Sequence, residues 1–401
     1  MRHLFFLCVL LAFPLSITAQ KKELSTAKAN LKQGKNLEQS EKDMRKLLEQ
    51  PANRQNEKIW LTLFDIVKKQ YDQGNEKLYL KQNYDTAKIF QLTEKMFDVL
   101  ERFDSIDAMP DGNGIVKPKH RKKHASLLND YRPNLYNGGR YFVNKKNYKE
   151  GFQCYDMYIG CTTMPLFEQY RYESDSTLLR EAAYWASFCA HQQKDTEATL
   201  SHKDLALKDQ AHHNSLLQIL SDTYLLKGDT LHYLETLNEG FQKYTQTPYF
   251  FQNLVQHYGV LQEWKTILKY ANQGIEVDSV GVNFLFSKCA ALLNMGRYEE
   301  CISVGNKIIA INDSIAEIYY NVGLAHFNQA VLLDKNVKKT AKQKNQMMEQ
   351  YQKARPFMER YRALAPDKQQ QWASPLYTIY LNLNMGKEFE EIDKLIRQNS
   401  K

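Results

Sequence analysis

The feature that most constrains this chain is a 34-residue period that runs without a gap from residue 214 to residue 313. Three contiguous blocks begin at Asn214, Pro248 and Val282, and a fourth begins in phase at Ala316. Each block holds two apolar stripes at helical spacing, separated by a turn written KGDT, QEWK or MGRY. A single helical hairpin cannot bury both of its apolar faces, so the hairpins must stack on one another. The period therefore predicts an all-α repeat protein.

Equivalent positions of the blocks share apolar side chains, which predicts where the core lies. Three columns carry this pattern: Leu217, Phe251, Leu285 and Tyr319; Leu234, Leu268 and Ile302; and Phe241, Ile275 and Ile309. A repeat array grows by adding neighbours, so one array can account for all 401 residues without a central core. The low usage of Gly (17) and Pro (10) suits long helices with few interruptions.

Three features of these blocks resemble the tetratricopeptide repeat (TPR) family. They are the block length, an aromatic residue after the turn (Trp264, Tyr298) and a mostly small residue in the first helix (Ser221, Val255, Cys289, Gly323). The clearest match is AEIYYNVGLAHFN (316–328), which is similar to a first helix of that family. The resemblance implies a right-handed α-solenoid of stacked antiparallel helix pairs and a habit of binding proteins, but no reaction.

Two residues depart from the family pattern. Val255 and Tyr233 are larger than the family usually allows where the paired helices touch, which predicts splayed repeats there. The expected organisation of the chain is a signal peptide (1–19), degenerate helical repeats (20–106), a loop and basic segment (107–131), a TPR-like repeat with an insertion (132–179), four contiguous 34-residue repeats (180–315), an extended helical hairpin (316–366) and a capping helix pair (367–401).

The N-terminus is typical of an export signal. A short basic start at Arg2 and His3 precedes an apolar run from Leu4 to Leu15, and Ala19 ends a small-residue cleavage site. The run is too short to span a bilayer comfortably, and no later stretch approaches that length. We expect an exported protein of the periplasm or the cell exterior.

The composition disfavours a nucleic-acid partner. Fifty-four Lys and Arg against 46 Asp and Glu give a net charge of +8, which is mild for this length. The sharpest basic run is KPKHRKKH (117–124), where His120 and His124 lie four residues apart. It is interpreted as a solvated helix start, with contact to an anionic lipid or glycan surface of the envelope as the alternative. A zinc site there would need further ligands and would face repelling cations.

The sequence gives no sign of catalysis. It contains no HExxH, GxSxG, GxxxxGK or dinucleotide-binding motif. We therefore expect no catalytic residue, no metal and no cofactor, although an enzyme of unknown type stays as a third interpretation. Five cysteines follow the signal, and the resemblance places Cys289 and Cys301 in contact within one hairpin, either as thiols or as a disulfide.

The favoured function is a non-enzymatic scaffold that binds a peptide or protein partner. The resemblance implies that the first helices line a concave groove, and aromatic rings beside amides on their non-core faces suit an extended peptide. The expected groove residues are Tyr136, Asn137, Arg140, Tyr184, Trp185, Phe188, Gln218, Asp222, Tyr249, Gln252, Asn253, Gln256, Asn283, Phe286, Tyr320 and Asn321. Packing of these rings between neighbouring repeats is the competing interpretation.

Overall fold

The computed structural model describes residues 20–172, 176–334 and 340–399. The predicted export signal, Met1 to Ala19, lies outside these ranges. All regular secondary structure within them is helical, so the predicted all-α helical repeat fold is confirmed. The chain divides into two compact units, Met1–Thr230 and Leu231–Lys401, which are described separately. Within the described ranges, none of the helices combines the length and apolar character needed to cross a bilayer.

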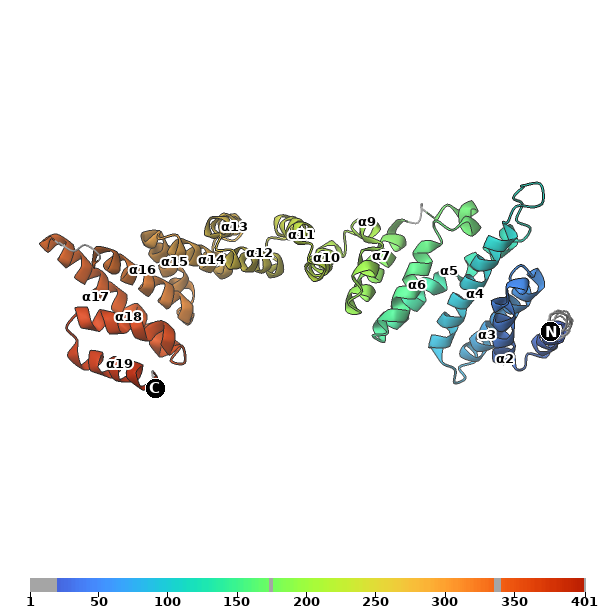
Figure 1. The fold of residues 1–401 in the computed structure, drawn as a ribbon, viewed down its shortest axis with the longest axis horizontal. Helices are drawn as coiled ribbons and strands as arrows, with labels where there is room; N and C mark the ends of the chain where they lie inside the picture. The colour runs from blue at the N-terminus through green and yellow to red at the C-terminus, as the bar shows by residue number, and fades with distance from the viewer. Residues whose placement is uncertain (1–19, 173–175, 335–339, 400–401) are drawn as a thin grey trace, which may run out of the picture. The chain divides into compact units, whose positions relative to one another are not determined.

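The first unit is a row of packed helices (Figure 1). Residues 20–33 are helical. The elements that follow are α2 (Leu37–Glu49), η1 (Pro51–Asn53), α3 (Glu57–Tyr79), α4 (Thr86–Asp107), α5 (Arg121–Asn144), α6 (Tyr148–Gly160), η2 (Pro165–Tyr170), α7 (Ser176–Gln192), α8 (Thr196–Leu200), α9 (Lys203–Ala206) and α10 (His213–Lys227). From α2 to α8, each α-helix packs against the next in the chain, whereas α9 and α10 both pack against α7.

Local signals in the sequence set several of these helix ends. The side chain of Asn56 accepts a hydrogen bond from the Lys58 backbone N–H at 3.1 Å, which caps α3. Asp85 caps α4 in the same way through Ala87, at 3.0 Å. Helices α5 and α6 approach closely because Gly139 has no side chain: a Cβ atom there would lie 2.5 Å from the Tyr155 ring.

The basic segment leads into a helix start, as expected, and its lysines are exposed, but Arg121 and His120 are engaged within the fold. Arg121 begins α5 and forms a bidentate ion pair with Asp104 of α4, with nitrogen to oxygen distances of 2.8 to 3.2 Å. The His120 backbone N–H donates to Asp107 at 2.7 Å. Residues far apart in the sequence therefore neutralise part of this segment, and α5 already includes residues 121–131.

The second unit contains the regular repeats. Its elements are α11 (Thr230–Lys243), which starts at the last residue of the first unit, α12 (Pro248–Val260), α13 (Trp264–Val277), α14 (Val282–Asn294), α15 (Tyr298–Ile311), α16 (Ala316–Asp334), α17 (Ala341–Leu364), α18 (Gln369–Asn382) and α19 (Gly386–Asn399). The starts of α12, α14 and α16 are 34 residues apart, as are those of α11, α13 and α15. The predicted period is thus the period of the helices.

One contact is repeated at the same spacing and sets how neighbouring repeats stack. A Cβ atom on Gly240 would lie 2.2 Å from the Phe250 ring, and one on Gly274 would lie 2.3 Å from the Phe284 ring. In each case a bare helix surface receives an aromatic ring from the first helix of the next repeat. Glycine is required here by the close approach of the ring, since both residues lie inside helices where alanine would otherwise be preferred.

The first column of predicted core residues is buried throughout: Leu217, Phe251, Leu285 and Tyr319 are all less than a tenth exposed. In the second and third columns only Phe241 is fully buried, and the other residues are half-buried. Tyr233 is buried and its ring contacts His257 of α12. The block expected as one hairpin from residue 214 contributes α10 to the first unit and most of α11 to the second.

The long pair after residue 316 is stabilised by a capping box. The Thr340 hydroxyl accepts from the Gln343 backbone N–H, and the Gln343 side chain accepts from the Thr340 backbone N–H. Helix α17 packs along α16 and against α18, which packs in turn against α19 (Figure 1). The block at residues 180–213 is less regular than expected, because the short helices α8 and α9 occupy its second half.

Candidate functional site

Helix α12, the first helix of its repeat in the second unit, carries a row of polar residues on one face. Tyr249, Gln252, Asn253 and Gln256 follow one another at helical spacing on one face. Gln252 and Gln256 are exposed, whereas Tyr249 and Asn253 are half-buried. The Asn253 amide donates to the Tyr249 backbone carbonyl at 2.8 Å, which fixes its side chain against the helix. The two glutamines are the members of this row most accessible to a partner.

The predicted groove residues on α14 and α16 differ in accessibility. Asn283 is exposed, and Phe286 is half-buried. Tyr320 is half-buried, and its ring lies 5.0 Å from the ring of Tyr361. Asn321 is 7% exposed, so its amide is unavailable as groove wall. Accessible surface on this side is therefore concentrated at the start of α14.

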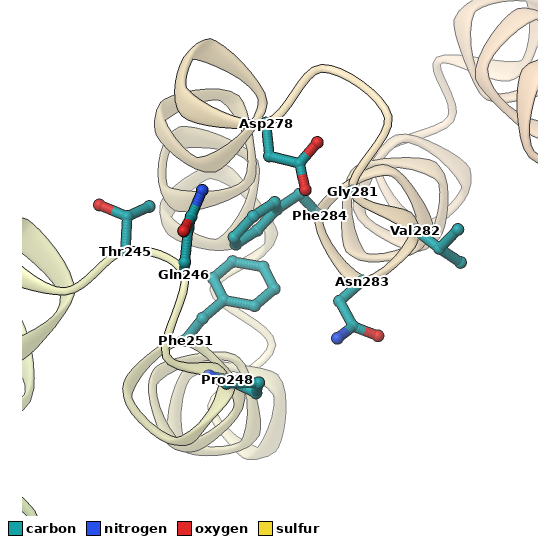
Figure 2. A pocket seen from close by; sticks show the side chains of 9 residues that line it. All are labelled: Thr245, Gln246, Pro248, Phe251, Asp278, Gly281, Val282, Asn283 and Phe284. Carbon is teal, nitrogen blue, oxygen red and sulfur yellow. The ribbon is translucent and has the colours of Figure 1, made fainter.

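A cavity of about 310 Å³ opens beside that exposed asparagine. It lies where the connection before α12 meets the connection before α14, and Figure 2 shows Phe251 and Phe284 at its centre. Its lining consists of Thr245, Gln246, Pro248, Phe251, Asp278, Gly281, Val282, Asn283 and Phe284. The 34-residue period produces this arrangement, because Pro248 and Val282 are equivalent first residues of successive helices.

The two phenylalanines form an apolar floor. Phe251 is 2% exposed and Phe284 is 8% exposed, and their ring centroids are 4.7 Å apart in an edge-to-face arrangement. Phe284 can occupy this position because Gly274 and Gly281 leave room on either side of it: a Cβ atom on either glycine would lie within 3 Å of the ring. The floor is thus held by packing between repeats.

Polar groups at the rim of the cavity fall into two kinds. Thr245 and Asp278 are engaged within the chain, since the Thr245 hydroxyl donates to the Phe241 carbonyl at 2.8 Å and Asp278 accepts from the Val280 backbone N–H at 3.2 Å. Gln246 and Asn283 are exposed, and their amides make no hydrogen bond to any residue that the structure describes. A side-chain amide offers both a donor and an acceptor, which is the chemistry needed to pair with a peptide main chain.

In the first unit, several predicted groove rings pack inside the fold. Tyr136 of α5 is 8% exposed and lies against the rings of Tyr155 and Tyr158, at 5.8 and 5.6 Å. Asn137 and Arg140, on the same helix, are exposed. Only the two polar members of this α5 group are therefore accessible.

The α7 group is an aromatic cluster. Tyr184 is 6% exposed and stacks on His212 at 4.2 Å. Trp185 and Phe188 are half-buried with ring centroids 5.4 Å apart, and the Trp185 indole N–H donates to Glu181 at 3.4 Å. These internal contacts cover much of the ring surface that was expected to face the groove. Tyr136 and Tyr184 are buried, as the competing interpretation of rings packed between neighbouring repeats would have it.

The predicted groove residues of α10 are half-buried polar side chains. The Gln218 amide donates to the Asn214 side chain at 2.9 Å, and Asp222 lies 3.9 Å from His191. Of these two residues, Asp222 is brought near α7 by its contact with His191.

The expected contact between Cys289 and Cys301 is present. Their sulfur atoms are 3.3 Å apart, both side chains are fully buried, and both are free thiols. The other three cysteines, Cys154, Cys161 and Cys189, are also buried thiols. Burial raises the pKa of the Cys189 thiol to about 12, so it stays protonated at neutral pH.

Of the two histidines of the basic segment, His124 is buried in the first unit and His120 is half-buried. The rings of His120 and His124 stack at 5.4 Å, and His120 contacts Glu57 at 2.8 Å. Burial, followed by the charges of His120 and Lys123, lowers the pKa of His124 to about 4. Among the described residues, no group of three His, Cys, Asp or Glu side chains is placed to hold a metal ion.

Some residues of the cavity were not predicted from the sequence. Gln246 and Asp278 precede the helices, whereas the expected groove was confined to the first helices themselves. Both residues lie in connections between successive blocks, and stacking brings such connections side by side, so the period could have indicated them.

No family model and no curated protein matches this sequence. Similar solved structures include the C-terminal part of a TPR repeat-containing protein from Cytophaga hutchinsonii (10% identity, TM-score 0.43, covering 65% of this chain and 93% of that one). A TPR repeats protein from Bacteroides fragilis is 15% identical, with a TM-score of 0.29 and coverage of 66% and 98%. YrrB, described as a TPR protein with an unusual peptide-binding site, is 13% identical, with a TM-score of 0.26 and coverage of 63% and 96%. The helical repeat fold itself follows from the chain's own period and helix pairs.

Proposed function

We propose that this protein is a non-enzymatic scaffold that binds an extended peptide segment of a protein partner at the start of α12 and α14. The cavity floored by Phe251 and Phe284 carries this proposal. It receives one apolar side chain of the peptide, while Gln246 and Asn283 pair with the main chain beside it. The exposed Gln252 on α12 continues the polar surface along the bound segment.

The chemistry of the site favours binding over catalysis. Its acidic group, Asp278, is held by the Val280 backbone N–H, and the remaining accessible groups at the rim are amides. Neither amides nor phenylalanine rings supply a nucleophile or a general base. A small apolar pocket with a few convergent hydrogen-bonding groups is instead what fixes the register of a peptide.

Selection of a randomised linear peptide library on the purified protein tests the proposal. Enriched peptides should share one large apolar residue. Asn283→Trp places a bulky ring at the mouth of the cavity and should weaken their binding by about tenfold or more, since loss of one buried anchor typically costs about 2 kcal/mol. Affinity is measured by fluorescence anisotropy of labelled peptides.

Asn294→Trp is the matched control, because Asn294 is exposed at the other end of the same helix. It should leave affinity unchanged. Equal weakening by both variants, or selected peptides that bind Asn283→Trp as tightly as the unmodified protein, would show that the cavity is not the peptide site. Failure to enrich any peptide would count against the proposal as well.

A second candidate function is contact with an anionic envelope surface through the basic segment. Ile115 and Val116 are about half exposed in the loop before α5, and Asp111 braces that loop by accepting from the Asn113 and Ile115 backbone N–H groups. Lys117, Lys119, Lys122 and Lys123 follow, all exposed and without an ion pair among the described residues. Apolar tips beside unpaired lysines suit a bilayer with anionic headgroups.

Vesicle flotation tests this candidate. The protein should float with vesicles that contain phosphatidylglycerol, not with phosphatidylcholine alone, and added salt should release it. Changing the four lysines to glutamine should abolish flotation. The same change at Lys28, Lys32, Lys35 and Lys42, which are also exposed, is the control and should not. Equal losses in both sets would refute a role for this loop.

We also propose that the protein is exported, with removal of Met1 to about Ala19. The support is the order of basic, apolar and small residues at the N-terminus. Terminal sequencing of the protein from its native envelope should find a start near Gln20. Recovery of the uncleaved chain only with detergent would contradict cleavage.

A further inference from the structure

A larger cavity, of about 770 Å³, lies in the first unit between the ends of three helices. Helix α2, the short η1, α3 and α4 all contribute to it. Its lining consists of Arg45, Leu48, Glu49, Pro51, Arg54, Gln55, Trp60, Leu63, Arg102, Ile106 and Met109. The peptide site proposed above lies in the second unit and contributes nothing to this cavity.

Its floor is apolar and rigid. Trp60 is 9% exposed and Leu63 is 1% exposed, so both are fixed in the core of α3. The Trp60 indole N–H donates to the Arg54 backbone carbonyl at 2.8 Å, which satisfies the polar atom of the ring and leaves its apolar face to the cavity wall. Met109, which is 50% exposed after the end of α4, adds a flexible apolar side chain at the edge.

Its rim carries three guanidinium groups and one carboxylate, that of Glu49. Asp98 holds two of the arginines: it accepts from the Arg102 Nε at 2.6 Å and lies 3.7 Å from the Arg45 Nη1. The Arg54 guanidinium makes no ion pair within the described ranges. Glu41 also accepts from the Arg45 Nε at 3.0 Å, so two of the three guanidinium groups are balanced by carboxylates. The cavity therefore combines one guanidinium group without an acidic partner in the described part of the chain, that of Arg54, with an apolar floor.

We propose that this cavity binds a small amphipathic carboxylate, with its aliphatic part on Trp60 and Leu63 and its carboxylate against Arg54 and Arg102. Arginine is suited to this role because its planar fork of N–H groups matches a carboxylate with two parallel hydrogen bonds. Arg102 retains its Nη donors for that purpose, since its bond to Asp98 uses Nε.

Other occupants fit the cavity less well. A small inorganic anion would leave the tryptophan and leucine surface in contact with water. A neutral hydrocarbon would leave Arg54 without a partner. The volume lies within the range of about 300 to 1,000 Å³ that is usual for small-molecule sites, so a chain of moderate length can be enclosed.

Titration with decanoate below its micelle concentration, read by intrinsic fluorescence, tests the proposal. The indole of Trp60 lines the cavity, so binding should give a saturable change in emission. Two further probes separate the parts of the ligand: decanol keeps the chain without the charge, and acetate keeps the charge without the chain. Decanoate should bind at least tenfold more tightly than either.

Variants locate the site. The double variant Arg54→Gln, Arg102→Gln should weaken decanoate binding at least tenfold and leave any weak binding of decanol unchanged. Both side chains are exposed, so the fold should survive, and circular dichroism checks this. Arg297→Gln removes an exposed arginine of the second unit and is the control of equal chemistry.

Calorimetry of Trp60→Phe verifies the reporter, because decanoate should still bind while the fluorescence change disappears. The proposal is overturned if decanol binds as tightly as decanoate, if acetate competes on equal terms, or if the double arginine variant binds decanoate like the unmodified protein.

Discussion

Replacing Gly274 by alanine should destabilise the contact between α13 and α14, although the same change stabilises most helices. The reason is the ring of Phe284, which lies on the bare surface of Gly274. An added Cβ atom would be 2.3 to 2.6 Å from three of the ring carbons. Contacts below about 3 Å are not tolerated, so either the ring or the helix has to move.

Two opposing effects set the magnitude. Alanine is favoured over glycine inside a helix by about 1 kcal/mol. Overpacking a core position usually costs about 1 to 3 kcal/mol, and the depth of this overlap places it at the upper end. The net loss should therefore be about 2 kcal/mol. Because Phe284 also floors the proposed peptide cavity, Gly274→Ala should weaken peptide binding together with stability.

Hydrogen exchange measured by mass spectrometry is the suitable assay, because an array in two units does not unfold in one step. Segments covering α13 and α14 should exchange faster in Gly274→Ala. Gly259→Ala is the matched control, since Gly259 also lies inside a helix and its added Cβ would meet only Ile267, at 4.0 Å. It should slow exchange slightly.

A second variant isolates the ring. In the background of Phe284→Ala the clash is absent, so Gly274→Ala should become stabilising by about 1 kcal/mol. If Gly274→Ala slows exchange in the otherwise unmodified protein, as Gly259→Ala does, the ring does not lie tightly on the helix. The account of stacking through paired glycine and phenylalanine positions would then be wrong.

Two further predictions concern the first unit and the thiols. Burial raises the pKa of Glu94 from its ordinary 4.5 to about 7, so between these pH values the folded chain keeps a proton that the unfolded chain releases. The free energy of unfolding of the first unit should therefore fall by up to about 3 kcal/mol as the pH rises from 4.5 to 7. Glu94→Gln should abolish that loss in urea titrations, and an unchanged pH dependence would contradict it. Alkylation of the native protein should spare all five cysteines from Cys154 to Cys301, because they are buried, and should modify all five after denaturation without reductant. Labelling of only three would reveal a bond between Cys289 and Cys301.

The regular part of the fold was predictable because the period fixes the register. Once Pro248 and Val282 are aligned, the positions of the turns and the helix starts follow from the repeat alone. The contact between Cys289 and Cys301 was expected from the resemblance to the TPR family. What the period does not give is which side of each first helix is accessible. Tyr136 and Tyr184 have the spacing expected of groove residues, yet both are buried, because their rings pack against other rings of the first unit: Tyr155 and Tyr158 for Tyr136, and His212 for Tyr184. A single sequence shows an aromatic residue at a position but not the space around it.

The cavity beside Trp60 in the first unit shows a different limit of prediction from the sequence. Arg54, Trp60 and Arg102 are brought together by the packing of three helices in a part of the chain that has no regular period. No spacing in the sequence relates Arg102 to Arg54, and Asp98, which orients Arg102, is an ordinary helix carboxylate until the contact with Arg45 is known. Repeats of equal length place equivalent residues on equivalent surfaces. Where the period is absent, neighbouring helices can present different residues, and a site can form that occurs at one place only. We therefore expect individual chemistry in the degenerate repeats and extended, repetitive binding surface in the regular ones.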